Sequence, residues 1–279
     1  MPKLIDSHTH LQFSAFKQDR NQVIEKALSD NIWLINVGTQ KDTSLKAIEI
    51  SEKYQKGVYA TVGLHPIHTQ KSYFDPQEFD GNGGFTSLGE KFDYEFYKKL
   101  AVHPKVVAIG ETGLDYYRIG SNDLEARNLQ KEVFIEHLEL AKEVNKPPMI
   151  HCRVAFSELI EILTTNYSLF NSPPGIIHFF TGTAEEAKNL LDLGFSFTFG
   201  GLITFNRDLD PIIKSLPIEK ILLETDAPYI SPVPYRGKRN ESLYVTEVAK
   251  KIAEIRNDSL ENISKQTTTN ALDIFNLLR

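Results

Sequence analysis

The sequence alternates between short, apolar, β-rich runs and longer amphipathic stretches along most of its length. The short runs are rich in β-branched or aromatic residues, as is typical of strands that are buried on both faces. The eight runs are LIDSH (4–8), WLINVG (33–38), VYATVGLH (58–65), VVAIGE (106–111), PMIHC (148–152), GIIHFF (175–180), FSFTFGG (195–201) and ILLETD (221–226). This pattern favours a parallel sheet that is covered by helices.

Amphipathic stretches separate these runs and indicate the helices. Examples are residues 21–31, 41–55, 129–145 and 184–194. Eight strand–helix alternations in roughly 250 residues favour an α/β fold of the (β/α)₈ TIM-barrel type. An open, doubly wound sheet is the alternative, but no Gly-rich dinucleotide-binding loop supports it. We therefore expect residues 1–279 to form a single barrel domain.

Two segments interrupt or extend this repeat. Residues 72–95 are rich in Gly and Asp and have little periodicity, which indicates a surface loop or lid. After the eighth run, residues 243–279 contain two further helical patterns. Asp258 and Glu261 resemble a capping box at the start of the second of these helices.

Composition limits the class of protein. A single cysteine, Cys152, rules out an internal disulfide and fits a reducing compartment. No signal-peptide pattern is visible, and no stretch approaches the roughly 18 apolar residues of a transmembrane helix. The formal charge is −6, so a nucleic-acid ligand would need a local basic patch. We expect a cytoplasmic monomer that does not bind membranes and needs no obligate protein partner.

Metal-binding side chains are concentrated where the predicted strands end. His8 and His10 lie two residues apart, so they face the same side of the first strand. An isolated pair of this kind can also be a hydrogen-bonded structural pair. Four further residues close four other runs: Glu111, His151, His178 and Asp226. The carboxyl ends of barrel strands meet on one face, so the sequence predicts a metal centre there.

Six ligands exceed the four that one tetrahedral ion takes, so we expect two divalent cations. Glu111, on a middle strand, is the predicted bridge, because the two oxygens of one carboxylate can bind two ions. The other ligands divide into two sets, His8, His10 and Asp226 for one ion and His151 and His178 for the other. Imidazole and carboxylate ligands admit zinc, manganese, iron or magnesium.

The remaining histidines and the cysteine have other interpretations. His65 ends the third run, and we interpret it as a substrate contact rather than a metal ligand. Cys152 directly follows His151, so it points outward as a small buried apolar residue. His103 and His137 lie in helical or loop patterns, and we expect both to face solvent.

Seven short motifs are spread over nearly the whole chain, from residue 6 to about residue 245. They are DSHTHL, VGLHP, IGETGLDYYR, IHCR, HFFTG, LLETDAPY and GKRNE followed by YV. Together they closely resemble the TatD family of metal-dependent deoxyribonucleases, within the wider amidohydrolase-like barrels. The resemblance implies a metallo-dependent hydrolase barrel with two divalent cations, and the six predicted ligands correspond to the family's metal positions. It also implies hydrolysis of phosphodiester bonds in DNA, often from the 3′ end.

A hypothesis for the mechanism gives roles to further residues. A metal-activated water would attack phosphorus, with Asp226 accepting its proton and Glu111 bridging the ions. The candidate phosphate contacts are Arg118, Arg153 and the basic cluster of Arg236, Lys238 and Arg239, for which surface salt bridges are the alternative. Tyr116 and Tyr117 can stack on bases or pack at the rim. DNA, including single-stranded DNA, is the expected substrate.

Two departures from the family pattern concern the site. Phe179 stands where many members have cysteine, and the segment at 72–95 is longer than in many members. The alternative enzymatic function is an ester or amide hydrolase with the same dinuclear site, such as a D-aminoacyl-tRNA deacylase. The non-enzymatic alternative is a metal-loaded scaffold that binds nucleic acid or protein, but the complete ligand set argues against it.

Overall fold

Parallel strands form the centre of the computed structural model, which describes residues 1–72, 77–78, 87–119 and 123–277. The strands are β1 (Leu4–Thr9), β2 (Ile32–Val37), β3 (Val58–Val62), β6 (Val106–Asp115), β7 (Pro148–Arg153), β8 (Ile176–Ile177), β9 (Ser196–Phe199) and β10 (Ile221–Leu223). They pair in this order as one eight-stranded sheet, and every neighbouring pair is parallel. A short antiparallel pair, β4 (Lys71–Ser72) and β5 (Ser87–Leu88), lies outside this sheet.

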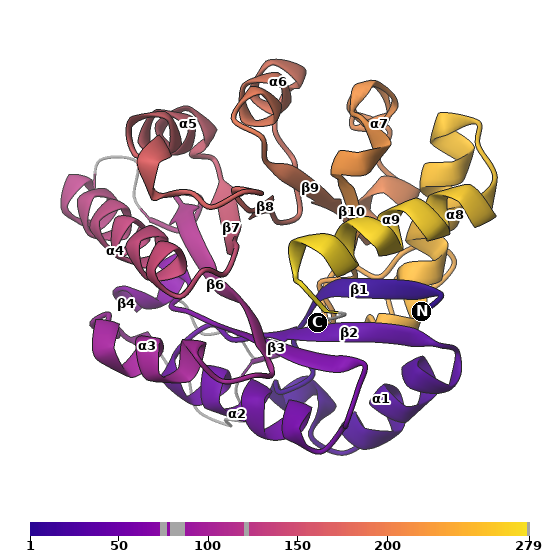
Figure 1. Cartoon of the computed structure of the whole chain (residues 1–279), viewed down its shortest axis with the longest axis horizontal. Coiled ribbons are helices and arrows are strands. Elements are labelled where there is room, and N and C mark those ends of the chain that lie inside the picture. The colour runs from indigo at the N-terminus through magenta and orange to yellow at the C-terminus, as the bar shows by residue number, and fades with distance from the viewer. Residues whose placement is uncertain (73–76, 79–86, 120–122, 278–279) are drawn as a thin grey trace.

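The two edge strands meet and nearly close the barrel. The Asp226 N–H donates to the carbonyl of His8 at 2.9 Å, and the His10 N–H donates to the carbonyl of Ala227 at 2.8 Å. Thr9 and Ala227 form a parallel bridge between the end of β1 and the segment after β10. Figure 1 shows the resulting ring of strands. The predicted (β/α)₈ TIM-type fold is therefore confirmed.

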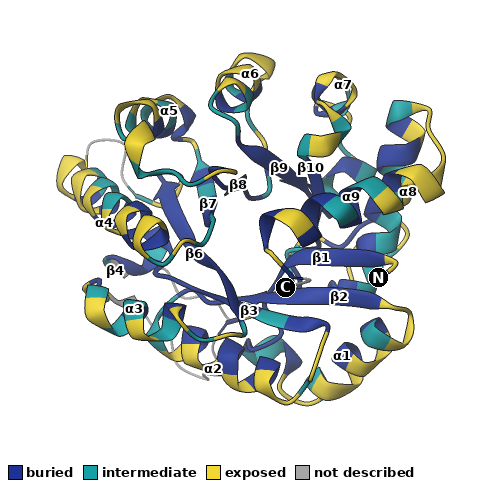
Figure 2. Ribbon diagram, in the orientation of Figure 1, coloured by how far each residue is buried: buried dark blue, intermediate teal, exposed yellow. Residues whose placement is uncertain are grey.

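Helices surround the sheet on its outer side, except for the last one, which lies across one end of the ring (Figure 1). They are α1 (Arg20–Ser29), α2 (Lys41–Glu52), α3 (Tyr94–Ala101), α4 (Leu124–Glu143), α5 (Phe156–Thr165), α6 (Ala184–Asp192), α7 (Asp210–Ser215), α8 (Val245–Arg256) and α9 (Leu260–Ile274). Short 3₁₀ turns are η1 (Ser14–Phe16), η2 (Pro66–His68), η3 (Tyr167–Leu169), η4 (Gly201–Thr204), η5 (Ile218–Lys220) and η6 (Ser242–Tyr244). The strands are buried, while the outward faces of the helices are exposed, as Figure 2 shows. Among the described helices, none is long and apolar enough to cross a bilayer.

Helix α9 covers the amino-terminal end of the barrel. The Asn270 amide donates to the carbonyls of Ile218 and Ile221, and the Thr268 hydroxyl donates to the carbonyl of Lys3. Apolar side chains from the strand interiors pack with those of α9 in one buried cluster that includes Ile5, Ile35, Met149, Ile176, Leu222, Leu272 and Phe275. This packing fills the amino end of the barrel.

Several boundaries differ from the sequence-based expectation. Strand β6 extends past Glu111 to Asp115, whereas β8 and β10 are only two and three residues long. The predicted capping box at Asp258 and Glu261 is wrong by one residue, since Ser259 is the N-cap of α9 and its side chain accepts from the Asn262 N–H. The difference arises because Asp258 instead binds the Ser259 N–H and the Asn262 amide.

The segment predicted as a loop or lid at 72–95 lies mostly outside the described residues. Within the part that is described, Glu78 is buried and α3 begins at Tyr94. The two helical patterns predicted within 243–279 are present as α8 and α9. The structure thus contributes Glu78 to the surroundings of the barrel mouth.

Candidate metal centre

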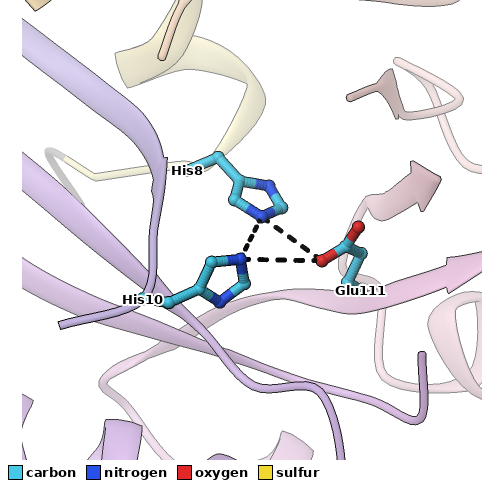
Figure 3. Close-up of side chains that lie close together, drawn as sticks. All are labelled: His8, His10 and Glu111. Carbon is cyan, nitrogen blue, oxygen red and sulfur yellow. Dashed lines mark hydrogen bonds and ion pairs between the residues drawn. The ribbon is translucent and has the colours of Figure 1, made fainter. Parts of the chain in front are cut away.

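The two histidines at the end of β1 point into the mouth of the barrel together. His8 and His10 are both buried, and their Nε2 atoms lie 3.0 Å apart. Figure 3 shows both imidazoles directed toward the carboxylate of Glu111, which comes from β6. Two ring nitrogens this close hold a proton or a cation between them, so the geometry is compatible with the predicted ligand pair.

The carboxylate of Glu111 faces imidazoles on both of its sides. Its Oε2 atom lies 3.4 Å from His8 Nε2 and 3.8 Å from His10 Nε2. Its Oε1 atom lies 2.8 Å from His151 Nδ1 and 3.6 Å from His178 Nε2. One oxygen therefore faces the histidines of β1, while the other faces those that follow from β7 and β8. This is the arrangement that a carboxylate needs to bridge two cations.

Asp226 faces the same point from the segment after β10. Its Oδ1 atom lies 3.4 Å from His10 Nε2 and 3.8 Å from His8 Nε2. The residue has a positive φ of 56°, which is uncommon for a non-glycine residue and turns the chain directly after the strand. The rings of His8 and His178 stack with centroids 3.5 Å apart. The contacts of Asp226 with His8 and His10 show that β1 and β10, the first and last strands of the ring, are neighbours at the site, as expected from barrel closure.

Three overlapping groups of side chains among the described residues bring their donor atoms within 4.8 Å of one another. These groups are His8, His10 and Glu111; His8, His178 and Asp226; and His65, Glu111 and His151. All six residues predicted as ligands occur in them. The structure therefore brings the predicted set together at the carboxyl end of the barrel.

His65 lies closer to this centre than the sequence indicated. Its Nε2 atom is 3.3 Å from Glu111 Oε1, and its ring centroid is 4.4 Å from that of His151. The sequence-based interpretation made it a substrate contact, but its position also suits a ligand on the His151 side of Glu111. The sequence signal for this location was that His65 ends the third β-rich run, at residues 58–65.

The outer nitrogens of two histidines are held by hydrogen bonds. His10 Nδ1 lies 2.8 Å from the carbonyl of Val37, and His178 Nδ1 lies 2.8 Å from Glu224 Oε2. Glu224 is fully buried and also accepts a hydrogen bond from Thr198 at 2.6 Å. Such bonds fix the ring orientation and direct Nε2 toward a metal, so the donor set fits a bound cation.

Glu224 and Asp115 are two buried acids that the sequence analysis missed. Glu224 lies two residues before Asp226, so strand alternation places both on the inner side. Asp115 Oδ2 lies 3.2 Å from His151 Nε2, on the opposite side of that ring from Glu111. Only the unexpected length of β6 brings Asp115 to the site. The two acids support the rings of His178 and His151.

The buried side chains at the centre differ in protonation when no cation is bound. Burial, together with the nearby His178, lowers the pKa of His8 to about 3, so this ring is neutral. Burial would raise the pKa of Glu111, but the surrounding histidines hold it well below its usual value. Burial opposes protonation of His151, but contacts with Asp115 and Glu111 raise its pKa to about 10. A cation that binds here displaces protons, because ligands must be deprotonated.

The centre opens into a cavity of about 230 Å³ at the barrel mouth. Its lining includes the predicted phosphate contacts Arg118 and Arg153. The Arg153 guanidinium lies 3.7 Å from the ring centroid of the exposed Tyr117. Tyr116 is buried and its hydroxyl donates to Glu158, so its ring packs inside the protein.

Arg239 does not line this cavity. Its guanidinium donates to both carboxylate oxygens of Asp19, at 2.8 and 2.7 Å, and to Glu241 at 3.1 Å. The ion pair raises the pKa of Arg239 further. Arg239 therefore forms surface salt bridges, which was the alternative to a phosphate contact. Arg236 and Lys238 of the same cluster are exposed.

The other histidines and the cysteine are placed as follows. The expectation that His137 faces solvent is wrong, because its ring is buried under α3 and accepts from the Leu64 N–H at 3.0 Å. Its Nδ1 lies 2.7 Å from the carbonyl of Val133, and burial lowers its pKa to about 4. His103 is partly exposed. Cys152 is buried and its pKa is raised well above the usual value by burial, which confirms its interpretation as a packing residue.

A parallel barrel with imidazoles and carboxylates at its carboxyl face defines the class of metal-dependent hydrolases. Names of related proteins agree with this class. The chain is 37% identical over 277 residues to the uncharacterized metal-dependent hydrolase YabD of Bacillus subtilis, covering 98% of this chain and 99% of the relative. The chain is therefore a hydrolase enzyme.

Within this class, the chain belongs to the TatD-related DNase family, whose family model matches residues 5–276. It is 31% identical to the 3′-5′ ssDNA/RNA exonuclease TatD of Pantoea ananatis, covering 99% of this chain and all of that one. Among solved structures, it is similar to YjjV, a TatD homologue from Escherichia coli, with a TM-score of 0.82, 27% identity and 98% coverage of both chains. The resemblance seen in the sequence is confirmed.

Proposed function

We propose that this protein hydrolyses phosphodiester bonds in single-stranded DNA and removes nucleotides from the 3′ end. The observation that carries the proposal is the position of Glu111, whose two oxygens face two separate sets of imidazoles. Paired cations that share a carboxylate are typical of phosphoesterases. The name of the Pantoea relative supports a nucleic-acid substrate and the direction of cleavage.

Two divalent cations would be held by the predicted ligands. The first set is His8, His10 and Asp226, the second is His151 and His178, and Glu111 belongs to both. Zinc, manganese or magnesium suits these donors. Such ions, when bound, lower the pKa of water and neutralise charge that develops on phosphoryl oxygens.

The side chains of the chain itself supply the proton acceptor and the substrate contacts. Burial would raise the pKa of Asp226, but the contact with His10 and nearby histidines lowers it, so the carboxylate is ionised. Its position beside His8 and His10 is the reason to assign it as the proton acceptor. Arg118 and Arg153 line the cavity and would bind phosphate oxygens. His65 would contact the substrate, because it lines the cavity beside Glu111.

The substitution Asp226→Asn tests this assignment. It keeps the shape of the side chain but removes the proton acceptor, so we expect hydrolysis of a 3′-labelled oligonucleotide to fall about 10²- to 10⁴-fold. The exposed Asp192, which pairs with Lys188 on α6, gives the control variant Asp192→Asn. Normal cleavage by Asp226→Asn would contradict the role of this residue. A D-aminoacyl-tRNA assayed in parallel distinguishes phosphodiester cleavage from ester hydrolysis.

Removal of metal tests the cofactor requirement. Exhaustive chelation should abolish cleavage of the oligonucleotide, because the proposed reaction needs divalent cations to activate water and to neutralise charge on the phosphoryl oxygens. Zinc, manganese and magnesium should then be returned one at a time, with elemental analysis of each sample. Two ions per chain are expected in the active form. Cleavage that persists in metal-free protein would refute the proposed function.

A further inference from the structure

Helix α4, which lies beside β6 in Figure 1, buries two polar side chains that the proposed function does not use. Gln130 and His137 are seven residues apart, so they share one face of the helix. The other buried residues of this helix are apolar: Ala126, Val133, Phe134, Leu138, Leu140 and Ala141. A buried amide or imidazole is costly unless it is hydrogen-bonded, so the partners of these two side chains indicate what they do.

The imidazole of His137 is bonded through both of its nitrogens. Its Nδ1 atom lies 2.7 Å from the carbonyl oxygen of Val133, so this nitrogen carries the proton. Its Nε2 atom accepts a hydrogen bond from the Leu64 N–H at 3.0 Å. Leu64 is buried and follows the end of β3, so its N–H needs a partner outside the sheet. His137 is that partner.

The side-chain amide of Gln130 joins two segments of the barrel mouth. Its oxygen accepts from the Asp115 N–H at 2.9 Å. Its nitrogen donates to the carbonyl of Asp115 at 3.2 Å and to the carbonyl of Pro66 at 3.3 Å. The amide therefore links the carboxyl end of β6 to the turn η2.

Together these bonds hold the backbone on both sides of His65. Leu64 precedes this residue and is bound by His137, while Pro66 follows it and is bound by Gln130. The N–H of His65 itself donates to the carbonyl of Thr39 at 2.8 Å. The direction in which the His65 side chain leaves the backbone thus depends on α4.

The turn also fixes the tautomer of His65. Its Nδ1 atom accepts from the Ile67 N–H at 3.1 Å, and a ring whose Nδ1 accepts carries its proton on Nε2. That Nε2 atom lies 3.3 Å from Glu111 Oε1. His65 therefore directs a hydrogen-bond donor at the centre. A metal ligand would need a lone pair there, so this tautomer favours a substrate contact.

We propose that His137 and Gln130 are positioning residues of the centre. His137 acts through the ring of His65. Gln130 acts through the same ring and also through Asp115, whose carboxylate lies 3.2 Å from His151 Nε2. The proposal rests on the proposed phosphodiester hydrolysis and names residues that set its rate without touching the substrate. A displacement of about 1 Å at a reacting centre can cost about 10²-fold in rate.

Two substitutions of His137 test this role in the metal-loaded protein. In His137→Leu the acceptor for the Leu64 N–H is absent, so we expect kcat/KM on the 3′-labelled oligonucleotide to fall about 10- to 100-fold. His137→Gln keeps an acceptor within reach and should stay within about threefold of wild type. The control is Leu138→Ala, which removes buried packing from the same helix but no hydrogen bond. It should keep the wild-type value, and near-UV circular dichroism shows that each variant is folded.

A double-mutant cycle shows whether His137 acts through His65. In the His65→Ala background, we expect His137→Leu to lower kcat/KM by less than about twofold, because the ring that it positions is absent. An equal fall in both backgrounds would refute the proposal. Wild-type kcat/KM in His137→Leu would also refute it.

Gln130→Met separates the two actions of the amide. Loss of support for Asp115 and His151 should lower the affinity for zinc about tenfold, in addition to the loss of kcat/KM. His137→Leu should keep the wild-type zinc affinity, because its bonds do not reach Asp115. Titration against a chromogenic chelator measures both. Unchanged zinc affinity in Gln130→Met would contradict its action through Asp115.

NMR spectra make the test independent of cleavage. The ¹⁵N signals of the zinc-loaded protein show which nitrogen of the His65 ring carries the proton. We expect Nε2 in wild type and in His137→Gln, and a mixture of both tautomers in His137→Leu. If these spectra are obtained but wild type cleaves no oligonucleotide, the proposed hydrolysis fails and the positioning of the ring stands. Identical His65 signals in wild type and His137→Leu would refute the positioning, whether or not the protein cleaves DNA.

Discussion

At the scale of single residues, the centre depends on a buried acid, Glu224, that does not line the cavity. Glu224 is fully buried, lies 2.8 Å from His178 Nδ1 and also binds the hydroxyl of Thr198. Burial opposes protonation of His178, but the charge of Glu224 raises its pKa to about 9. The carboxylate therefore fixes both the direction of the ring and the nitrogen that carries its proton.

The substitution Glu224→Gln removes this charge while it keeps the shape of the side chain. We expect the affinity for a divalent cation to fall about 10- to 100-fold, because outer partners of this kind hold and polarise the ligand. Titration of zinc against a chromogenic chelator measures this loss. The exposed Glu219 gives the control Glu219→Gln. Unchanged zinc affinity in Glu224→Gln would show that Thr198 and packing alone orient the ring.

At the scale of elements, α9 is the part that departs most from the simple repeat. It follows the last strand–helix unit and fills the amino end of the barrel with Leu272 and Phe275. Its first turn is fixed by Ser259, whose hydroxyl accepts from the Asn262 N–H at 3.1 Å. Local sequence placed the start of the helix one residue too early, since Asp, Ser and Glu all favour helix starts.

The cap assignment predicts a difference between two exposed positions. Ser259→Ala should lower the free energy of unfolding by about 1 kcal/mol, because it leaves a backbone N–H of the first turn without its partner. Glu261→Ala should change it by less than about 0.5 kcal/mol, as is usual for surface substitutions. Urea denaturation measures both. A larger loss for Glu261→Ala would restore the capping box that the sequence indicated.

At the scale of the whole molecule, barrel closure depends on a buried carboxyl group. Asp6 on β1 accepts hydrogen bonds from the Thr225 N–H at 2.8 Å and the Thr225 hydroxyl at 2.7 Å. These bonds join the first strand to the segment after the last strand. Burial raises the pKa of Asp6 to about 7, although the hydrogen bonds from Thr225 oppose this rise.

This raised pKa makes the stability of the barrel depend on pH. Between about pH 4 and pH 7 the folded state holds a proton on Asp6 that the unfolded state releases, so the contribution of Asp6 falls as pH rises. In Asp6→Asn, this pH-dependent contribution to the free energy of unfolding is absent. We expect its free energy of unfolding, relative to wild type, to increase from pH 5 to pH 8. Urea unfolding in a chelator at both pH values measures this difference, and an equal difference at both would contradict a raised pKa.

The sequence by itself determined the strand–helix repeat and the positions of the predicted ligands. Alternation in a strand and periodicity in a helix are local, so short segments reveal them without knowledge of distant contacts. The six predicted ligands, among them His8 and Asp226, come together in the structure, although β6 continues past Glu111. The parallel order of the strands followed from the same repeat.

Only the tertiary structure decided which side chains meet across the barrel. Arg239 pairs with Asp19, a residue 220 positions away, and Glu224 supports His178 across two strands. His137 is buried by packing that its own helix pattern does not reveal. Local periodicity specifies the face of an element, but the distance between two faces depends on how the whole ring closes. The partners of Glu111 are therefore properties of the closed barrel.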